Sequence, residues 1–157
     1  MLQLNDQQLF LSSNENSNSI ALMVKHLAGN MVSRWTDFKT TDGEKPNRNR
    51  DGEFENTIQN KTELLQIWNR GWACFFDAFD SISATELEDI IYIRNEEHTI
   101  QEALCRQLAH YPYHVGQIVY VAKMLKQTKW NSLSIPINKS KEYNIEKFET
   151  KKVRQTF

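Results

Sequence analysis

The sequence predicts an all-α protein built as a helical bundle. Apolar residues recur at steps of three and four through three long stretches of the chain, which is the spacing of one helix face. Pairs of residues that cap helix N-termini stand before several helical stretches. Only two short segments, residues 90–94 and 133–137, are expected to be extended. Helices joined by loops, with so little extended chain, are typical of a bundle.

Composition and charge indicate one soluble globular domain. The 157 residues are enough for a domain with its own core, and 39% of them are hydrophobic. The net charge of −1 argues against a nucleic-acid partner, and no apolar run reaches the ~20 residues of a membrane span. The N-terminus lacks the basic and apolar regions of a secretory signal, so we expect a cytoplasmic protein. Cys74 and Cys105 lack metal-ligand spacing and are expected to be reduced thiols in the core.

The first long helix is expected from about residues 17–19 to Trp35. Its apolar stripe consists of Ile20, Met23, Val24, Leu27, Met31 and Trp35. At about 100° per residue, His26 falls at the edge of this stripe, with Asn30 beside it. Before this helix, residues 3–10 have room for one short helical turn.

Arg34 lies within the angular range of the same apolar stripe. A charged group in that position needs a partner, because burying an unpaired charge is unfavourable. Asp37 and Asp51 are the candidate partners, which favours a structural role for Arg34 over a catalytic one.

Residues 37–58 form the longest irregular stretch, with two Asp-Gly pairs, a proline and no apolar period. Loops of this length inside a compact domain are uncommon and often functional. Arg48 and Arg50 could hold a carboxylate or phosphate, with Asp51 as a further polar group. The alternative is a lattice of ion pairs, including Glu53, that holds the loop in place.

A second long helix is expected after Asn60, which can cap it with Glu63 three residues on. Gly71 either weakens this helix or admits a close neighbour. Its broad apolar face is most simply part of the core. The residues of that face are Leu64, Leu65, Trp68, Trp72, Phe75, Phe76 and Phe79.

The longest helix is expected from about Thr99 to Gln127, and Thr99 with Glu102 forms a capping box. A short helix is expected over residues 83–89, directly ahead of the extended segment 90–94. Pro112 lies inside the long helix, where it removes one backbone hydrogen bond and is expected to bend it.

Two histidines, His110 and His114, lie four residues apart in this long helix. Residues so spaced share a helix face, with Cβ atoms roughly 6 Å apart, so both imidazoles can bind one cation. A third ligand is needed for tight binding, and His26 lies at the matching edge of another helix. Three protein ligands with open positions are typical of catalytic zinc. Asn30 and Gln117 are placed to orient a ligand or contact substrate. Chance spacing of amphipathic histidines is the alternative.

The motif His110-Tyr-Pro-Tyr-His-Val-Gly-Gln-Ile118 resembles the final-helix signature of the DinB-like superfamily. Three further blocks resemble one uncharacterised bacterial branch of that superfamily. They are the segment containing His-Leu-Ala-Gly-Asn-Met-Val-Ser-Arg-Trp-Thr-Asp-Phe (residues 25–38), Asp-Gly-Glu-Lys-Pro (42–46) and Arg-Asn-Arg-Asp (48–51). The resemblance extends over roughly residues 8 to 148.

This resemblance implies a four-helix bundle with an up-down-down-up order over residues 1–138. It also implies a divalent metal held by His26, His110 and His114, and a homodimer. Similar proteins have a full helix ahead of the segment that corresponds to residues 4–10, so we expect the first helix here to be short or missing. Residues 139–157, with six basic and three acidic side chains, are expected to form a surface extension.

Relatives in the superfamily include thiol transferases and a thiol-dependent isomerase. The resemblance therefore implies a metal-dependent enzyme that activates a thiol or water for attack on an electrophilic small molecule. Zinc or nickel is favoured, with iron or manganese as alternatives, because imidazole suits several of these metals. Two other hypotheses stay open, namely a metal-binding or stress-response protein without turnover and a helical dimerisation module.

Overall fold

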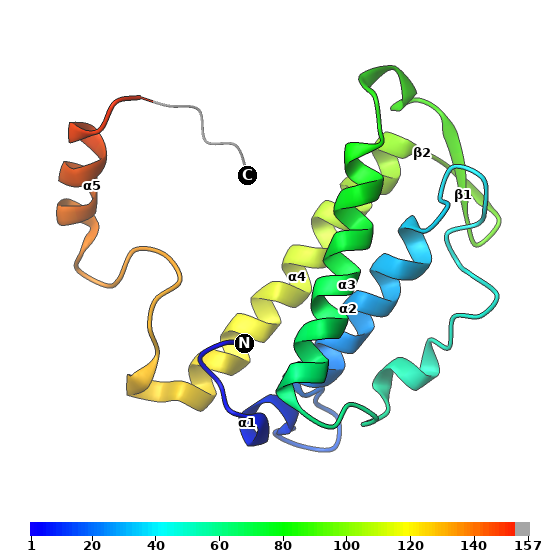
Figure 1. The fold of residues 1–157 in the computed structure, drawn as a ribbon. Helices are drawn as coiled ribbons and strands as arrows, with labels where there is room; N and C mark the ends of the chain where they lie inside the picture. The colour runs from blue at the N-terminus through cyan, green and yellow to red at the C-terminus, as the bar shows by residue number, and fades with distance from the viewer. Residues whose placement is uncertain (153–157) are drawn as a thin grey trace.

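The computed structural model describes residues 1–152, in which three long helices lie side by side as a bundle (Figure 1). This confirms the predicted all-α class. The helices are α1 (Asp6–Phe10), α2 (Ile20–Trp35), α3 (Lys61–Asp80), α4 (Ile100–Lys126) and α5 (Ser140–Glu149), with the 3-10 turns η1 (Asp51–Phe54), η2 (Ala84–Glu86) and η3 (Gln127–Lys129).

The predicted N-terminal caps are present at the long helices. The Asn60 side chain accepts a hydrogen bond from the backbone N–H of Glu63 at the start of α3. Thr99 and Glu102 form the reciprocal capping box of α4. The α4 helix continues through Pro112 as one element. The bend expected at that residue stays a prediction.

The long helices run in the directions that an up-down-down-up bundle requires for its last three members. Figure 1 shows α2 and α3 leaving the end of the molecule near α1 in parallel, while α4 returns in the opposite sense. In α2, His26 lies beside His114, and Trp35 further along donates a hydrogen bond of 3.0 Å to the hydroxyl of Tyr111. Residue numbers therefore rise along α2 as they fall along α4.

Gly71 lies where α3 approaches α2 closely. A Cβ atom added there would lie 2.8 Å from the Cα atom of Ala28. The close-neighbour interpretation of Gly71 is therefore confirmed. Because no side chain stands between them, the two helices can be in backbone contact.

Residues 36–60 join two parallel helices, so this connection has to bring the chain back along the bundle. It returns over α2 and places η1 against that helix. The second connection contains the hairpin of β1 (Ile90–Ile93) and β2 (Glu96–Thr99), whose register pairs Ile90 with Thr99. The sequence indicated the first of these strands but not the second, which is polar and lies directly before α4.

The buried side chains form two clusters, one toward each end of α2. The cluster near α1 includes Leu9, Leu27 and Leu64, and the cluster near the hairpin includes Trp35 and Ile93. The expected short first helix is confirmed, since α1 has five residues.

The aromatic face of α3 is less buried than the sequence suggested. Phe76 is 51% exposed and Phe79 is 49% exposed, so a core position is wrong for both. Cys105 is exposed as well and is not a core thiol. It lies two residues from the buried Ala103, about 200° around α4, and therefore points away from the neighbouring helices.

Residues 133–137, the second segment predicted to be extended, form bends and the start of a turn and belong to no strand. Beyond it, α5 stands apart from the bundle with no buried residue (Figure 1). The last part of the predicted surface extension, residues 153–157, lies outside the described residues. Over residues 1–152, no helix combines the length and the apolar character needed to cross a membrane.

Candidate metal centre

The structure brings together the three histidines that the sequence analysis selected. His26 projects from α2, and His110 and His114 project from α4, one turn apart. One ring nitrogen from each lies within 4.8 Å of the others, so the group could hold a metal ion. The imidazole centroids are 4.8 Å apart for His110 and His114, and 5.1 Å apart for His26 and His114.

Two of these imidazoles are oriented by hydrogen bonds on Nδ1. The carboxylate oxygen Oε2 of Glu53 lies 2.9 Å from Nδ1 of His26, and Oε1 of Gln117 lies 2.7 Å from Nδ1 of His114. Both partners are acceptors, which requires the proton on Nδ1 and leaves Nε2 with a free lone pair. A carboxylate behind a histidine is a common support for a metal ligand, because it holds the ring and raises its basicity.

Two features hold Glu53 beside His26, namely the ion pairs of Arg48 within the loop and the space left by a glycine on α2. Arg48 donates to Oε1 of Glu53 through Nε at 2.8 Å and to Oε2 through Nη2 at 3.0 Å. The same arginine pairs with Glu44 at 3.0 Å. On α2, a Cβ atom at Gly29 would overlap Oε1 of Glu53, so the glycine leaves room for the carboxylate in its present position.

Electrostatics favour the neutral form of His110 and His114 and the charged form of Glu53. Burial, together with the neighbouring His114 and His26 and the positive charges of Arg34 and Arg106, lowers the pKa of His110 to about 4. Burial also lowers the pKa of His114. Neutral imidazole is the form that binds metals, so these shifts suit ligand histidines at neutral pH.

Glu53 behaves in the opposite way to an isolated buried acid. Burial alone would raise the pKa of its carboxyl group, but the hydrogen bonds from His26 and Arg48 lower the pKa below its usual value. A charged Glu53 is therefore stabilised where it supports His26.

The remaining residues selected from the sequence have different surroundings. Arg48 belongs to the ion-pair lattice, as the alternative interpretation of the loop proposed. Arg50 and Asp51 are exposed, and the Arg50 guanidinium lies 5.9 Å from the ring centroid of Phe54. Within residues 1–152, Oδ1 of Asn30 is buried without a hydrogen-bond partner, so Glu53, and not Asn30, orients His26.

Sequence reasoning missed two contributors to the site, Glu53 as support and Phe54 as cover. The Phe54 ring stacks on His26 with centroids 5.2 Å apart. Glu53 had been considered only as a member of an ion-pair lattice. Its one sequence signal was its place beside two arginines in a long polar loop, and nothing local connects that loop with His26.

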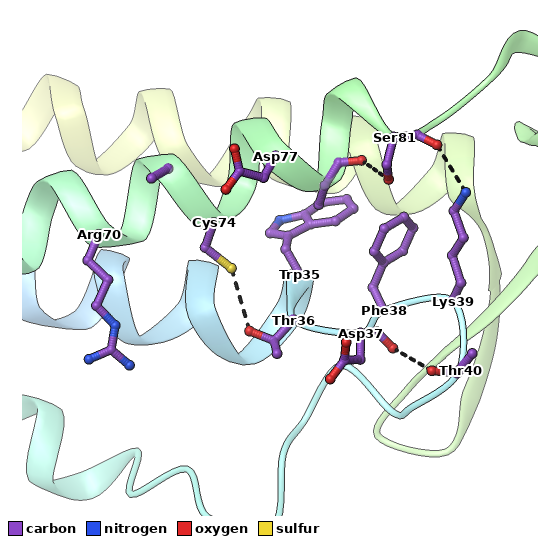
Figure 2. A pocket seen from close by; sticks show the side chains of 12 residues that line it. Trp35, Thr36, Asp37, Phe38, Lys39, Thr40, Arg70, Cys74, Asp77 and Ser81 are labelled. Atoms are coloured by element: carbon purple, nitrogen blue, oxygen red, sulfur yellow. Dashed lines mark hydrogen bonds between the residues drawn. The ribbon is translucent and has the colours of Figure 1, made fainter.

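Two hollows flank the C-terminal half of α2, and neither is lined by the three histidines. One, of about 670 Å³, lies between Trp35, Phe38 and α3, with the Cys74 thiol directed toward Thr36 (Figure 2). The other, of about 730 Å³, lies between α2, α3 and the loop, and Glu53 forms part of its lining. Glu53 thus connects this second hollow with the histidine group.

The donor set fits a divalent transition metal. Three imidazoles offer three nitrogen ligands, and no fourth protein ligand completes the group among residues 1–152. Such a site leaves coordination positions for a small molecule, as catalytic zinc sites do. The group also differs from a zinc site closed by four cysteines or histidines, which serves structure alone.

Comparison with known proteins places the chain in a family. The model of the family described as Protein of unknown function (DUF1572) matches residues 1–139, a stretch that contains all three histidines and Glu53. No curated protein and no solved structure matches the chain. Because the match covers most of its length, the chain belongs to this family.

Proposed function

We propose that this member of the DUF1572 family is a divalent-metal-dependent enzyme of the DinB-like class. It would act on an electrophilic small molecule, using a thiol or water as the attacking group. The observation that carries the proposal is the convergence of His26, His110 and His114, with Nδ1 of two rings already held by Glu53 and Gln117.

A bound metal would supply a Lewis acid that lowers the pKa of a thiol or water at neutral pH. The three histidines would hold zinc or nickel, or else iron or manganese. Glu53 and Gln117 would keep the imidazoles in their ligand orientation. Phe54 would limit access of water to one side of His26, and the exposed Arg50 beside it could contact an anionic part of the substrate.

Three features support the DinB-like assignment. The parallel pair α2 and α3, followed by antiparallel α4, is the helix order of that class. One ligand comes from the helix before the long connection and two from the last bundle helix. The connection itself, residues 36–60, packs against the first of these ligand-bearing helices.

A homodimer is the proposed assembly, because the described residues leave part of the aromatic face of α3 uncovered. Phe76 and Phe79 on this face are large apolar side chains, and each is about half exposed. Exposed apolar groups on one helix face are typical of interaction surfaces. Light scattering would give twice the chain mass for the wild type and the chain mass for Phe76→Glu, with far-UV circular dichroism unchanged. A monomeric wild type would contradict this assembly.

Metal content tests the first part of the function. Purified wild-type protein, reconstituted in turn with zinc, nickel, iron and manganese, is expected to hold about one ion per chain, the number that one three-nitrogen site takes. His110→Ala should lose most of it. His98→Ala is the matched control, because His98 lies in the hairpin outside the group, and it should bind as the wild type does. Wild-type protein without stoichiometric metal would contradict both a metal enzyme and a metal-binding protein.

Turnover separates an enzyme from a metal-binding protein. Metal-loaded protein would be incubated with several low-molecular-weight thiols and a bimane-type electrophile that fluoresces on thiol addition. We expect a rate that depends on both metal and His110. If metal binds but the rate equals that of the metal-free control with every thiol and with water, the non-catalytic alternative replaces the enzyme.

A further inference from the structure

Arg34 is a buried charge without a bonded counter-ion. Its side chain is 4% exposed, and neither Nε nor Nη1 has a hydrogen-bond partner within residues 1–152. The partners expected from the sequence, Asp37 and Asp51, do not reach it. Burying an unpaired guanidinium is strongly unfavourable, so this position calls for a ligand or another compensating group.

The charge of Glu44 acts on Arg34, but that carboxylate is already paired with other side chains. Oε2 of Glu44 pairs with Arg48 at 3.0 Å and with Arg94 at 3.3 Å. Glu53 is bonded to Arg48 and His26. Neither glutamate therefore forms an ion pair with Arg34 within residues 1–152.

Two buried amides stand one helical turn from the histidines. Asn30 is 6% exposed and lies on α2 between His26 and Arg34, one turn from each. Gln107 is 2% exposed and stands one turn before His110 and Tyr111 on α4. Within residues 1–152 the side-chain oxygen of neither amide has a hydrogen-bond partner. No such bond fixes either amide with its oxygen inward, and an amide that turns over presents N–H₂ donors in place of that oxygen.

Arg34 lies near α4, because the next residue, Trp35, donates a hydrogen bond of 3.0 Å to the hydroxyl of Tyr111, which follows His110. The charge of the exposed Arg106 lowers the pKa of Arg34, after the larger effect of burial. The guanidinium lies against the Asp42–Gly43 turn, where a Cβ atom at Gly43 would come within 3.2 Å of Nη1. The turn therefore closes one side of Arg34.

We propose that Arg34, with the amides of Asn30 and Gln107, binds the carboxylate of a small organic acid beside the three histidines. A guanidinium presents two parallel N–H donors that match the two oxygens of a carboxylate. The amide groups can turn their N–H₂ toward the same anion. A single compact negative charge suits so enclosed a position better than a phosphate dianion, which needs more donors.

This inference deepens the proposed function, because it makes the small-molecule substrate a carboxylate. It rests on that function only for the role as substrate. Carboxylate binding itself is measured on metal-free protein, so its failure is distinguishable from failure to bind metal or to turn over.

The test uses metal-free, full-length protein titrated with acetate, glycolate and succinate, each beside its neutral amide at equal ionic strength. The Nε–Hε nuclear magnetic resonance signal of Arg34, assigned through its own backbone, is followed. We expect saturable shifts with the acids and none with the amides. Arg34→Gln should weaken binding at least about tenfold, as loss of a buried charge partner does. Arg106→Gln, which removes a nearby exposed charge, should weaken it less than about threefold.

Four results would overturn the proposal. They are equal shifts with acids and amides, no saturable binding of any acid, equal losses in the two variants, and Arg34-dependent binding of inorganic phosphate tighter than that of every carboxylate. If Arg34→Gln does not fold, the wild-type Nε signal still decides between acid and amide.

Discussion

Helices α2 and α3 are parallel neighbours, yet they are buried to very different extents. Within the described residues, thirteen of the sixteen positions of α2 are buried, including polar ones, whereas only three of twenty are buried in α3. The difference arises because α2 is covered by α3, by α4, by α1 and by the loop with η1. On α3 only the side toward α2 is extensively covered.

This contrast explains why the histidine group lies on α2 and α4, whereas the exposed apolar surface lies on α3. A helix enclosed on all sides can hold His26, Asn30 and Arg34 in a place of low dielectric, where hydrogen bonds and charges act strongly. A helix with one open side keeps its aromatic residues available to another molecule. Four predictions test the contrast, from the largest expected effect to the smallest.

Truncation of a side chain on each helix should give the largest difference. Leu27→Ala on α2 removes a fully buried side chain and is expected to lower the free energy of unfolding by about 3–5 kcal/mol. Phe76→Ala on α3 removes a larger but half-exposed one and should lower it by less than about 1 kcal/mol. Urea unfolding at low protein concentration measures both. Equal losses would mean that α3 is covered as fully as α2.

The packing of the loop of residues 36–60 against α2 should depend on the carboxylate of Glu53. Glu53→Ala removes one of the two carboxylates that pair with Arg48. The substitution is expected to lower the free energy of unfolding by about 3 kcal/mol. It should also weaken metal binding about 10–100-fold, because His26 loses its support. Asp51→Ala, an exposed acid in the same turn, is the control and should change stability by less than about 0.5 kcal/mol. A matching loss in the control would assign the effect to net charge.

One substitution at two glycines should change stability in opposite directions. Gly71→Ala places a Cβ atom 2.8 Å from the backbone of Ala28 and should lower stability by about 1–3 kcal/mol, because the two helices have to separate. Gly116→Ala meets no atom within 4 Å on α4 and should raise stability by about 0.5–1 kcal/mol, because alanine restricts the unfolded chain. Thermal unfolding compares them. A neutral Gly71→Ala would mean that the α2–α3 contact is loose.

Lowering the pH should reduce the free energy of unfolding through His110, and this is the smallest of the expected effects. In metal-free protein the pKa of His110 is lowered from 6.5 to about 4, so between these values the unfolded chain binds a proton that the folded chain does not. Stability is therefore complete above pH 6.5 and falls as the pH decreases toward 4. Because His110 is only partly buried, we expect a loss of about 1 kcal/mol at pH 5. Urea midpoints at pH 7 and 5 measure it, and His110→Gln should show a smaller decrease.

Much of the fold could be predicted from local patterns. The apolar period of α2, the cap at Asn60 and the box at Thr99 each depend on residues a few positions apart, and all three appear in the structure. The hairpin's second strand could not be predicted, because its residues are polar and pair only through their backbone. The burial of Phe79 could not be predicted from the sequence either, because it depends on which helices are neighbours.

The sequence by itself determined the long helices and the three histidines at matching helix edges. His110 and His114 share a face by spacing alone, His26 lies at the edge of another apolar stripe, and the resemblance to a known class joins the three in one site. Only the tertiary structure decided that Glu53, 27 residues from His26 along the chain, would orient it, and that Arg34 would be buried without either predicted aspartate. The reason is that periodicity acts over a few residues, whereas the path of a long irregular loop depends on every surface that it crosses.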